Sequence, residues 1–227
     1  RRASATRSVL RPRRCSRGFW WESSEKSSPS CFVGHMCFHP RGGGAWLERE
    51  GFDPKLAGCV HVYRLADYLG DRELWGPGGS VLHELSHAYH DCALPGGHGN
   101  AAVARRYEAA VHGERLYDAV DVKGPQAEPR TAGERRRLAF RRACRCCAGG
   151  RSGVPRRHYA TTNAAEFFAE LSTAYLCDDA DDDYNKWAPF NRSQLARRDP
   201  ETAALLAKIW DGDDPGVDDD EPAAASC

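Results

Sequence analysis

The chain has 227 residues, 41% of them hydrophobic, and a formal net charge of zero, which predicts one domain of ordinary size with a buried core. The absence of net charge excludes bulk electrostatic attraction to nucleic acid or to an acidic membrane surface, so we expect neither partner. No apolar run approaches the roughly 20 residues that a membrane-spanning helix needs, so we expect no membrane span.

The N-terminal part of the chain contains one disordered segment and two predicted strands. Residues 1–30 are basic and then serine-rich, a composition that predicts poor order, with the aromatic cluster at 19–21 as the exception. Strands are predicted within 31–38 (CFVGHMCF) and near 60–63, after a glycine turn. The first residue is arginine rather than methionine, so we expect the N-terminus to be incomplete.

The remaining sequence predicts four helices and two irregular segments. The first helix begins near Ser80, a good N-cap, and the glycine-rich LPGGHGN follows its end near Cys92. Further helices are predicted at 101–113, within HYATTNAAEFFAELSTAYLC, and from about Pro200 to Trp210. The stretch 123–157, between the second and third of these helices, is rich in Arg, Gly and Pro. It could be an ordered insertion, a disordered loop or an error of gene prediction. The acidic residues 211–227 predict a disordered tail.

Residues 83–87 read HELSH, which is the pattern H-E-x-x-H. Residues four apart lie on one face of a helix, so His83 and His87 can present two imidazoles to one metal ion. Glu84 lies about 100° around the helix, where it can reach a metal-bound water but is not an easy third ligand. The pattern therefore predicts a zinc site with Glu84 as the general base.

A catalytic zinc usually takes three protein ligands and one water, so a further ligand is needed. The extended pattern H-E-x-x-H-x-x-G-x-x-H fails, because His90 and Ala93 stand at its glycine and last histidine positions. His90 and His98 remain minor candidates for the third ligand. We favour a glutamate on a later helix, where Glu166 and Glu170 lie four residues apart.

Glu166 also has a plain structural interpretation. It could cap its helix behind Asn163, as the third residue of a capping box does. Thr162 can cap equally well, which would leave the Glu166 carboxylate free to bind a metal ion.

The pair of segments HELSHAYH and YATTNAAEFFAELSTAY resembles the zinc metallopeptidase domain of anthrax lethal factor and its uncharacterised microbial relatives, which belong to the gluzincins. That family has the pattern Y-x(6)-E-x-F-A-E, and this chain has Tyr159, Glu166, Phe168, Ala169 and Glu170 at those spacings. The resemblance covers roughly residues 50–122 and 158–210. The gap between the two segments is longer than the family pattern predicts, because of the Arg-rich insertion.

The resemblance implies an α+β, zincin-like catalytic domain over residues 31–210. A small sheet would lie beside the H-E-x-x-H helix, and a second, helical subdomain would carry the ligand glutamate. The implied activity is zinc-dependent endopeptidase action on a peptide or protein substrate, by a chain that is monomeric by default. A catalytically silent zincin-fold binding module and a zinc hydrolase of a non-peptide amide remain alternatives.

The expected site follows from these assignments. The zinc ligands are His83, His87 and Glu166, and the catalytic residues are Glu84 and Tyr159. By resemblance the Tyr159 hydroxyl stabilises the oxyanion, and Glu170 hydrogen-bonds a ligand histidine. The alternatives are a packing role for Tyr159 and a solvent-facing carboxylate for Glu170.

The ten cysteines have no regular spacing, which favours free thiols in a reducing, intracellular compartment over a disulfide framework. One group, Cys31, His35, Cys37 and His39, shares a face of the predicted strand. At about 3.3 Å per residue it spans roughly 26 Å, so one ion cannot bind all four. We interpret these as ordinary strand residues.

Overall fold

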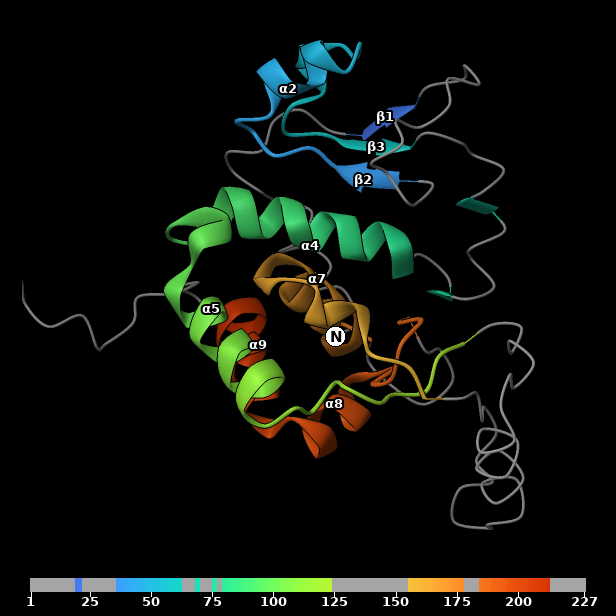
Figure 1. The fold of residues 1–227 in the computed structure, drawn as a ribbon, viewed down its shortest axis with the longest axis vertical. Coiled ribbons are helices and arrows are strands. Elements are labelled where there is room, and N and C mark those ends of the chain that lie inside the picture. The colour runs from blue at the N-terminus through green and yellow to red at the C-terminus, as the bar shows by residue number, and fades with distance from the viewer. Residues whose placement is uncertain are drawn as a thin grey trace, which may run out of the picture.

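The computed structural model describes residues 19–21, 36–62, 68–69, 75–76, 79–123, 155–177 and 184–212. The predicted disorder of 1–30 apart from 19–21, nearly all of the insertion at 123–157 and nearly all of the tail at 211–227 lie outside these residues. The described residues combine helices with one small sheet, which agrees with the α+β prediction. The long helix α4 (Gly79–Ala93) separates the sheet from the other long helices (Figure 1).

The sheet consists, within the described residues, of three short strands in the order β1-β3-β2. Strand β1 (Phe19–Trp21) runs parallel to β3 (Val60–Val62), and β2 (Met36–Phe38) runs antiparallel to it. One face of β2 and β3 packs on α4, through a small apolar cluster of Met36, Phe38, Val60 and Val62 against Val81, Leu85 and Ala88. Because side chains alternate along a strand, Cys37 and His61 occupy the opposite face.

Among the described residues, the helices predicted from the sequence are present, and α2 (Gly44–Arg49) and α8 (Arg192–Arg198) were not predicted. Both have six or seven residues, too short for a periodic apolar pattern to reveal them. The other elements are α5 (Ala101–Tyr107) with a π-helical continuation (Glu108–Gly113), α7 (Ala164–Tyr175), α9 (Pro200–Asp211) and 3-10 turns at Pro54–Leu56, Gly97–Gly99 and Tyr159–Thr161.

The start of α4 differs from the prediction. The helix begins at Gly79, so Ser80 is buried in its first turn and is not the N-cap. A side chain at position 79 is excluded, because a Cβ there would lie 2.0 Å from the backbone oxygen of Tyr184. The close approach of Tyr184 therefore requires glycine at the first residue of α4.

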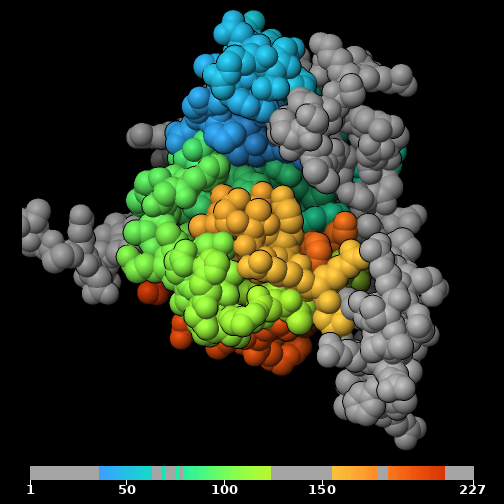
Figure 2. All heavy atoms as spheres, in the orientation of Figure 1, coloured from blue at the N-terminus to red at the C-terminus, as the bar shows by residue number. Residues whose placement is uncertain are grey.

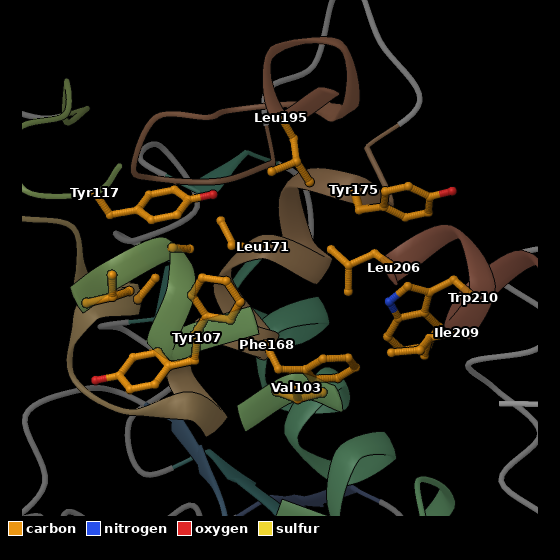
Figure 3. Packing of buried hydrophobic residues seen from close by; sticks show 14 of the residues in the cluster. Val103, Tyr107, Tyr117, Phe168, Leu171, Tyr175, Leu195, Leu206, Ile209 and Trp210 are labelled. Atoms are coloured by element: carbon orange, nitrogen blue, oxygen red, sulfur yellow. The ribbon is translucent and has the colours of Figure 1, made fainter. Parts of the chain in front are cut away.

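The main core lies on the far side of α4 from the sheet, among α5, α7, α8 and α9 (Figure 3). Helix α7 runs through its centre, with Phe167, Phe168 and Leu171 each at most 1% exposed. In the space-filling view the residues of α7, in orange, fill the space between α4 and α5 (Figure 2). The core thus holds α7 firmly along one flank of α4.

Of the four described cysteines, Cys37, Cys59 and Cys177 are not in a disulfide, whereas Cys92 takes part in one. The prediction that the cysteines stay out of disulfides is therefore met at these three positions and wrong at Cys92. No helix among the described residues combines the length and the apolar character needed to cross a membrane.

Just before α7, His158 is buried between two aromatic rings, stacked on Trp187 and edge-on to Tyr117. Its Nδ1 accepts a hydrogen bond of 2.9 Å from the backbone N–H of Ala160. Burial, with smaller contributions from Arg198 and His83, lowers the pKa of His158 to about 3. The folded protein therefore keeps this ring neutral at pH values where the unfolded chain protonates it.

We predict that His158→Asn flattens the acid dependence of stability. His158 contributes stability above its unfolded pKa of 6.5, and this contribution is lost as pH falls from 6.5 toward 3. The slope is about 1.4 kcal/mol per pH unit for one proton. Asparagine can still accept the Ala160 N–H but cannot titrate. Urea unfolding between about pH 4 and pH 6 measures the slope, with exposed His112→Asn as control; an unchanged slope in the His158 variant would contradict the prediction.

Candidate metal centre

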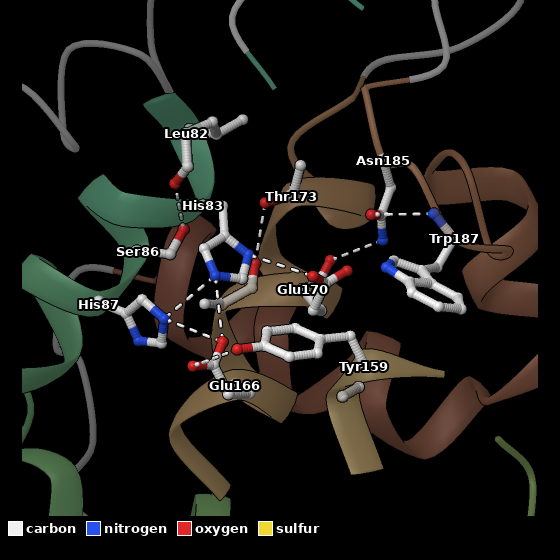
Figure 4. A network of polar contacts seen from close by, with 12 residues as sticks. Leu82, His83, Ser86, His87, Tyr159, Glu166, Glu170, Thr173, Asn185 and Trp187 are labelled. Carbon is white, nitrogen blue, oxygen red and sulfur yellow. Dashed lines mark hydrogen bonds and ion pairs between the residues drawn. The ribbon is translucent and has the colours of Figure 1, made fainter. Parts of the chain in front are cut away.

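Three side chains from two helices converge in the space between α4 and α7 (Figure 4). The Nε2 atoms of His83 and His87, one turn apart on α4, lie 3.1 Å from each other. Glu166, in the first turn of α7, places Oε2 at 3.1 Å from the His83 nitrogen and 3.2 Å from the His87 nitrogen. Among the described residues this is the one group of three potential ligands whose atoms all lie within 4.8 Å of one another.

The spacing of these atoms fits a bound divalent ion. Tetrahedral coordination with bonds of about 2.0–2.1 Å separates neighbouring ligand atoms by about 3.3 Å, close to the observed 3.1–3.2 Å. Hydrogen bonds alone do not explain the triangle, because each imidazole Nε2 carries at most one proton and can donate it along one direction. One cation would satisfy all three lone pairs, so the cluster could hold a metal ion with one position left for water.

An aromatic contact fixes how α4 and α7 meet. His90 of α4 lies 4.6 Å from the Phe168 ring of α7, measured between centroids, and Tyr89 of α4 lies 4.4 Å from Trp210 of α9. Phe168 and Trp210 are stacked at 5.9 Å, and the Trp210 Nε1–H donates to Ser172 Oγ at 3.0 Å. We call this set of His90, Tyr89, Phe168, Trp210 and Ser172 the aromatic joint. It holds the two ligand-bearing helices in one register.

The first turn of α7 leaves the Glu166 carboxylate available. Asn163 is the N-cap, and its Oδ1 accepts the backbone N–H of Glu166 at 2.9 Å. Thr162, the alternative cap, instead donates its hydroxyl to the backbone oxygen of Tyr159. Glu166 therefore contributes its backbone to the cap while its side chain points at the two imidazoles.

Glu170 lies one turn further along α7, against the other nitrogen of His83. Its Oε1 is 3.4 Å from His83 Nδ1, and the carboxylate is fully buried. Burial raises the pKa of Glu170 to about 7, although the nearby His83 acts in the opposite direction. The contact is an ion pair without a hydrogen bond, since His83 Nδ1 and both Glu170 oxygens have no hydrogen-bond partner among the described residues. Closer approach of the two groups would fix the tautomer with Nδ1 protonated and Nε2 directed to a bound metal.

Glu84 is held by the sheet rather than by the helices. Its Oε2 accepts the backbone N–H of Phe38, at the outer edge of β2, at 2.7 Å. Burial raises the pKa of Glu84, while the nearby His83 and His87 lower it. Sequence reasoning could not find Phe38, because a backbone donor has no characteristic residue type.

Tyr159 stands at the open side of the site, on the 3-10 turn that precedes α7. Its hydroxyl donates to Glu166 Oε1 at 3.4 Å, and the residue is 44% exposed. Burial of part of the ring and the carboxylates of Glu166 and Glu170 raise the pKa of Tyr159, so its hydroxyl stays protonated as a donor. Trp75, which the sequence did not single out, packs edge-on against the His83 ring at 5.5 Å.

The centre concentrates negative charge where the ligands converge. Burial acts to lower the pKa of His83, but Glu166, Glu170 and Glu84 outweigh it and raise this pKa to about 9. Although burial opposes it, hydrogen bonds from the two imidazoles hold the pKa of Glu166 well below its usual range. Three carboxylates around two imidazoles thus attract a cation, and protons compete with it for the same atoms.

The two minor candidates do not join the ligand cluster. His90 is completely buried in the aromatic joint and also contacts the His98 ring edge-on. His98 donates through Nε2 to the backbone oxygen of His87 at 3.4 Å. Both histidines therefore support the helix that carries His83 and His87.

Comparison with known proteins adds no relative: no family, curated protein or solved structure matches this chain. The interpretation of the centre rests on the positions of its own residues.

We predict that Glu166→Gln lowers metal affinity at least about 100-fold, because it removes the one ionised carboxylate that closes the ligand triangle. Zinc affinity measured by competition with a chromophoric chelator tests this. The matched control is Glu201→Gln, which changes an exposed glutamate in the first turn of another helix. Unchanged affinity in the Glu166 variant would remove this residue from the ligand set.

Glu170→Gln should weaken metal binding by a smaller factor, about 10- to 100-fold, because it acts through His83 and not on the ion. The same competition assay measures it. A loss as large as that of Glu166→Gln would show that Glu170 binds the ion directly, and no loss would show that it does not orient His83.

Proposed function

We propose that this chain is a zinc-dependent metalloendopeptidase with a zincin-like catalytic domain. The observation that carries the proposal is the convergence of His83, His87 and Glu166 on one point, with Glu84 and Tyr159 beside it. Two imidazoles and one carboxylate leave a fourth position for water, which is the ligand set of hydrolytic rather than structural zinc. The placement of a small sheet and a helical half on opposite sides of α4 supports the fold assignment.

The proposed chemistry assigns each residue one task. Zinc held by His83, His87 and Glu166 would supply a Lewis acid and would lower the pKa of a bound water toward about 7. Glu84 would accept a proton from the attacking water and return it to the leaving amine, as general base and then general acid. The Phe38 N–H restrains one oxygen of Glu84, at Oε2, which leaves the other oxygen for the proton transfer.

Tyr159 and Glu170 complete the assignment. The Tyr159 hydroxyl donates to the oxyanion that forms on the attacked carbonyl, and its exposure places it where a substrate can arrive. Glu170, 3.4 Å from His83 Nδ1, would orient the His83 ring so that its Nε2 lone pair faces the centre. Both side chains lie on the segment 159–170. The turn and helix that carry Glu166 therefore also carry the residues that contact Glu166 and His83.

We predict that Glu84→Gln keeps zinc and loses hydrolysis. The amide oxygen of glutamine can still accept the Phe38 N–H, but it cannot take a proton from water, which costs about 10²- to 10⁴-fold in kcat. Zinc content and cleavage of a peptide library, with and without chelator, measure the two properties. Glu108→Gln, an exposed change on the π-helical turn, is the control. Wild-type turnover in Glu84→Gln would contradict the proposed mechanism.

Tyr159→Phe should lower kcat by about 10²- to 10³-fold, the usual loss for one oxyanion donor. KM and zinc content should stay near those of the wild-type chain, because the ring remains and only the hydroxyl is removed. A change in KM alone would assign Tyr159 to substrate binding instead.

A further inference from the structure

A second group of metal-binding residue types lies on the opposite face of the sheet from α4. The sequence Cys-x-His occurs twice, as Cys37-Phe38-His39 and as Cys59-Val60-His61. In the antiparallel pair of β2 and β3, Cys37 stands opposite His61. The backbone N–H of His39 donates to the oxygen of Cys59 at 3.0 Å, so these two residues also stand side by side.

Strand geometry places all four side chains together. Phe38 and Val60, the middle residues of the two repeats, face α4. Their neighbours in sequence therefore face away from α4, because side chains alternate along a strand. Residues two apart on one strand and directly opposite on the next strand are close enough to share an ion. The single strand predicted from the sequence within 31–38 could not offer this arrangement, because it lacks Cys59 and His61.

Two of the interatomic distances already match those of a metal centre. His39 Nε2 lies 3.3 Å from His61 Nδ1, and Cys37 Sγ lies 3.7 Å from His39 Nε2. Tetrahedral zinc, with bonds of about 2.3 Å to sulfur and 2.0–2.1 Å to nitrogen, requires about 3.3 Å between nitrogens and about 3.5 Å between sulfur and nitrogen. The donors do not yet enclose one point, as the His83 triangle does. Cys59 Sγ contacts the Lys55 oxygen at 3.7 Å and would have to rotate inward.

The surroundings suit a closed structural site. His39, His61 and Cys59 are at most 3% exposed, and neither Cys37 nor Cys59 is in a disulfide. The rings of Trp46 and Phe52 pack against the two histidines. Two cysteines and two histidines fill all four positions of a tetrahedral ion, which leaves no position for a substrate.

An ion here would tie together a layer whose strands are short. Strands β2 and β3 have three residues each, so few backbone hydrogen bonds join them. The layer's apolar contact with α4 is the small cluster of four strand residues.

We propose that Cys37, His39, Cys59 and His61 bind one structural zinc ion, separate from the ion between α4 and α7. If the proposed peptidase function holds, the ion has a second effect. Phe38 lies between two of the ligands, and its N–H holds the Glu84 carboxylate. The ion would then steady the general base from the far side of the sheet. The site itself does not depend on the chain being a peptidase.

Cobalt substitution of the full chain tests the proposal without any activity assay. The background carries serine at Cys144, Cys146 and Cys147, so that these thiols cannot bind cobalt. We expect two equivalents of Co²⁺ per chain and a thiolate-to-cobalt charge-transfer band in the near ultraviolet. Cys37→Ser with Cys59→Ser should remove the band and one equivalent. Glu166→Gln should lower the affinity for the other Co²⁺ ion and leave the charge-transfer band unchanged. Cys177→Ser, the control, should bind two equivalents and show the band.

Thiol labelling keeps the test decisive if the double variant does not fold. In the zinc-loaded wild-type chain, Cys37 and Cys59 should resist alkylation. Removal of zinc should raise the alkylation rate of both thiols by a factor at least ten times larger than that at Cys177. A single equivalent of cobalt without a thiolate band, a band that survives in the folded double variant, or labelling unaffected by zinc would each overturn the proposal. If the wild-type chain binds two metal ions but cleaves no peptide, the result would count against the proposed function and not against the structural zinc site.

Discussion

The packing of α7 against α4 is the constraint on which the whole centre depends. The histidine pair is a local property of one helix, but Glu166, the proposed third ligand, lies 79 residues after His87 in the sequence. The aromatic joint brings the two together, since Phe168 and Ser172 of α7 contact His90 and Trp210, while Tyr89 of α4 contacts Trp210 as well. The joint thereby brings the Glu166 carboxylate beside the two imidazoles.

Burial of so many ionisable groups needs a compensating charge. Two imidazoles and the carboxylates of Glu84, Glu166 and Glu170 share a small volume with little solvent, where an unpaired charge is expensive. A proton on His83 offsets part of this charge, as its pKa of about 9 indicates. A divalent cation offsets more of it and satisfies three lone pairs at once. The electrostatics of the site and its geometry therefore favour the same occupant.

The sequence predicted two kinds of feature: those that depend on neighbouring residues, and those that a family resemblance supplied. The spacing of His83 and His87 follows from helix periodicity alone, whereas Glu166 was one of several candidates until the Tyr159-to-Glu170 pattern favoured it. Contacts between distant segments left no such signal. Phe38 acts through its backbone, and Ser80 looks like an N-cap although the helix starts one residue earlier. The likeness of Cys37-x-His39 to Cys59-x-His61 gains meaning only from the register of β2 and β3.

The central claim is that one zinc ion joins α4 to α7, and anomalous X-ray diffraction at the zinc absorption edge tests it most directly. Crystals of the zinc-loaded chain should show a peak about 2.0–2.2 Å from the Nε2 atoms of His83 and His87 and from a carboxylate oxygen of Glu166. The absence of a peak between the two helices, or a peak there whose ligands exclude Glu166, would contradict the account.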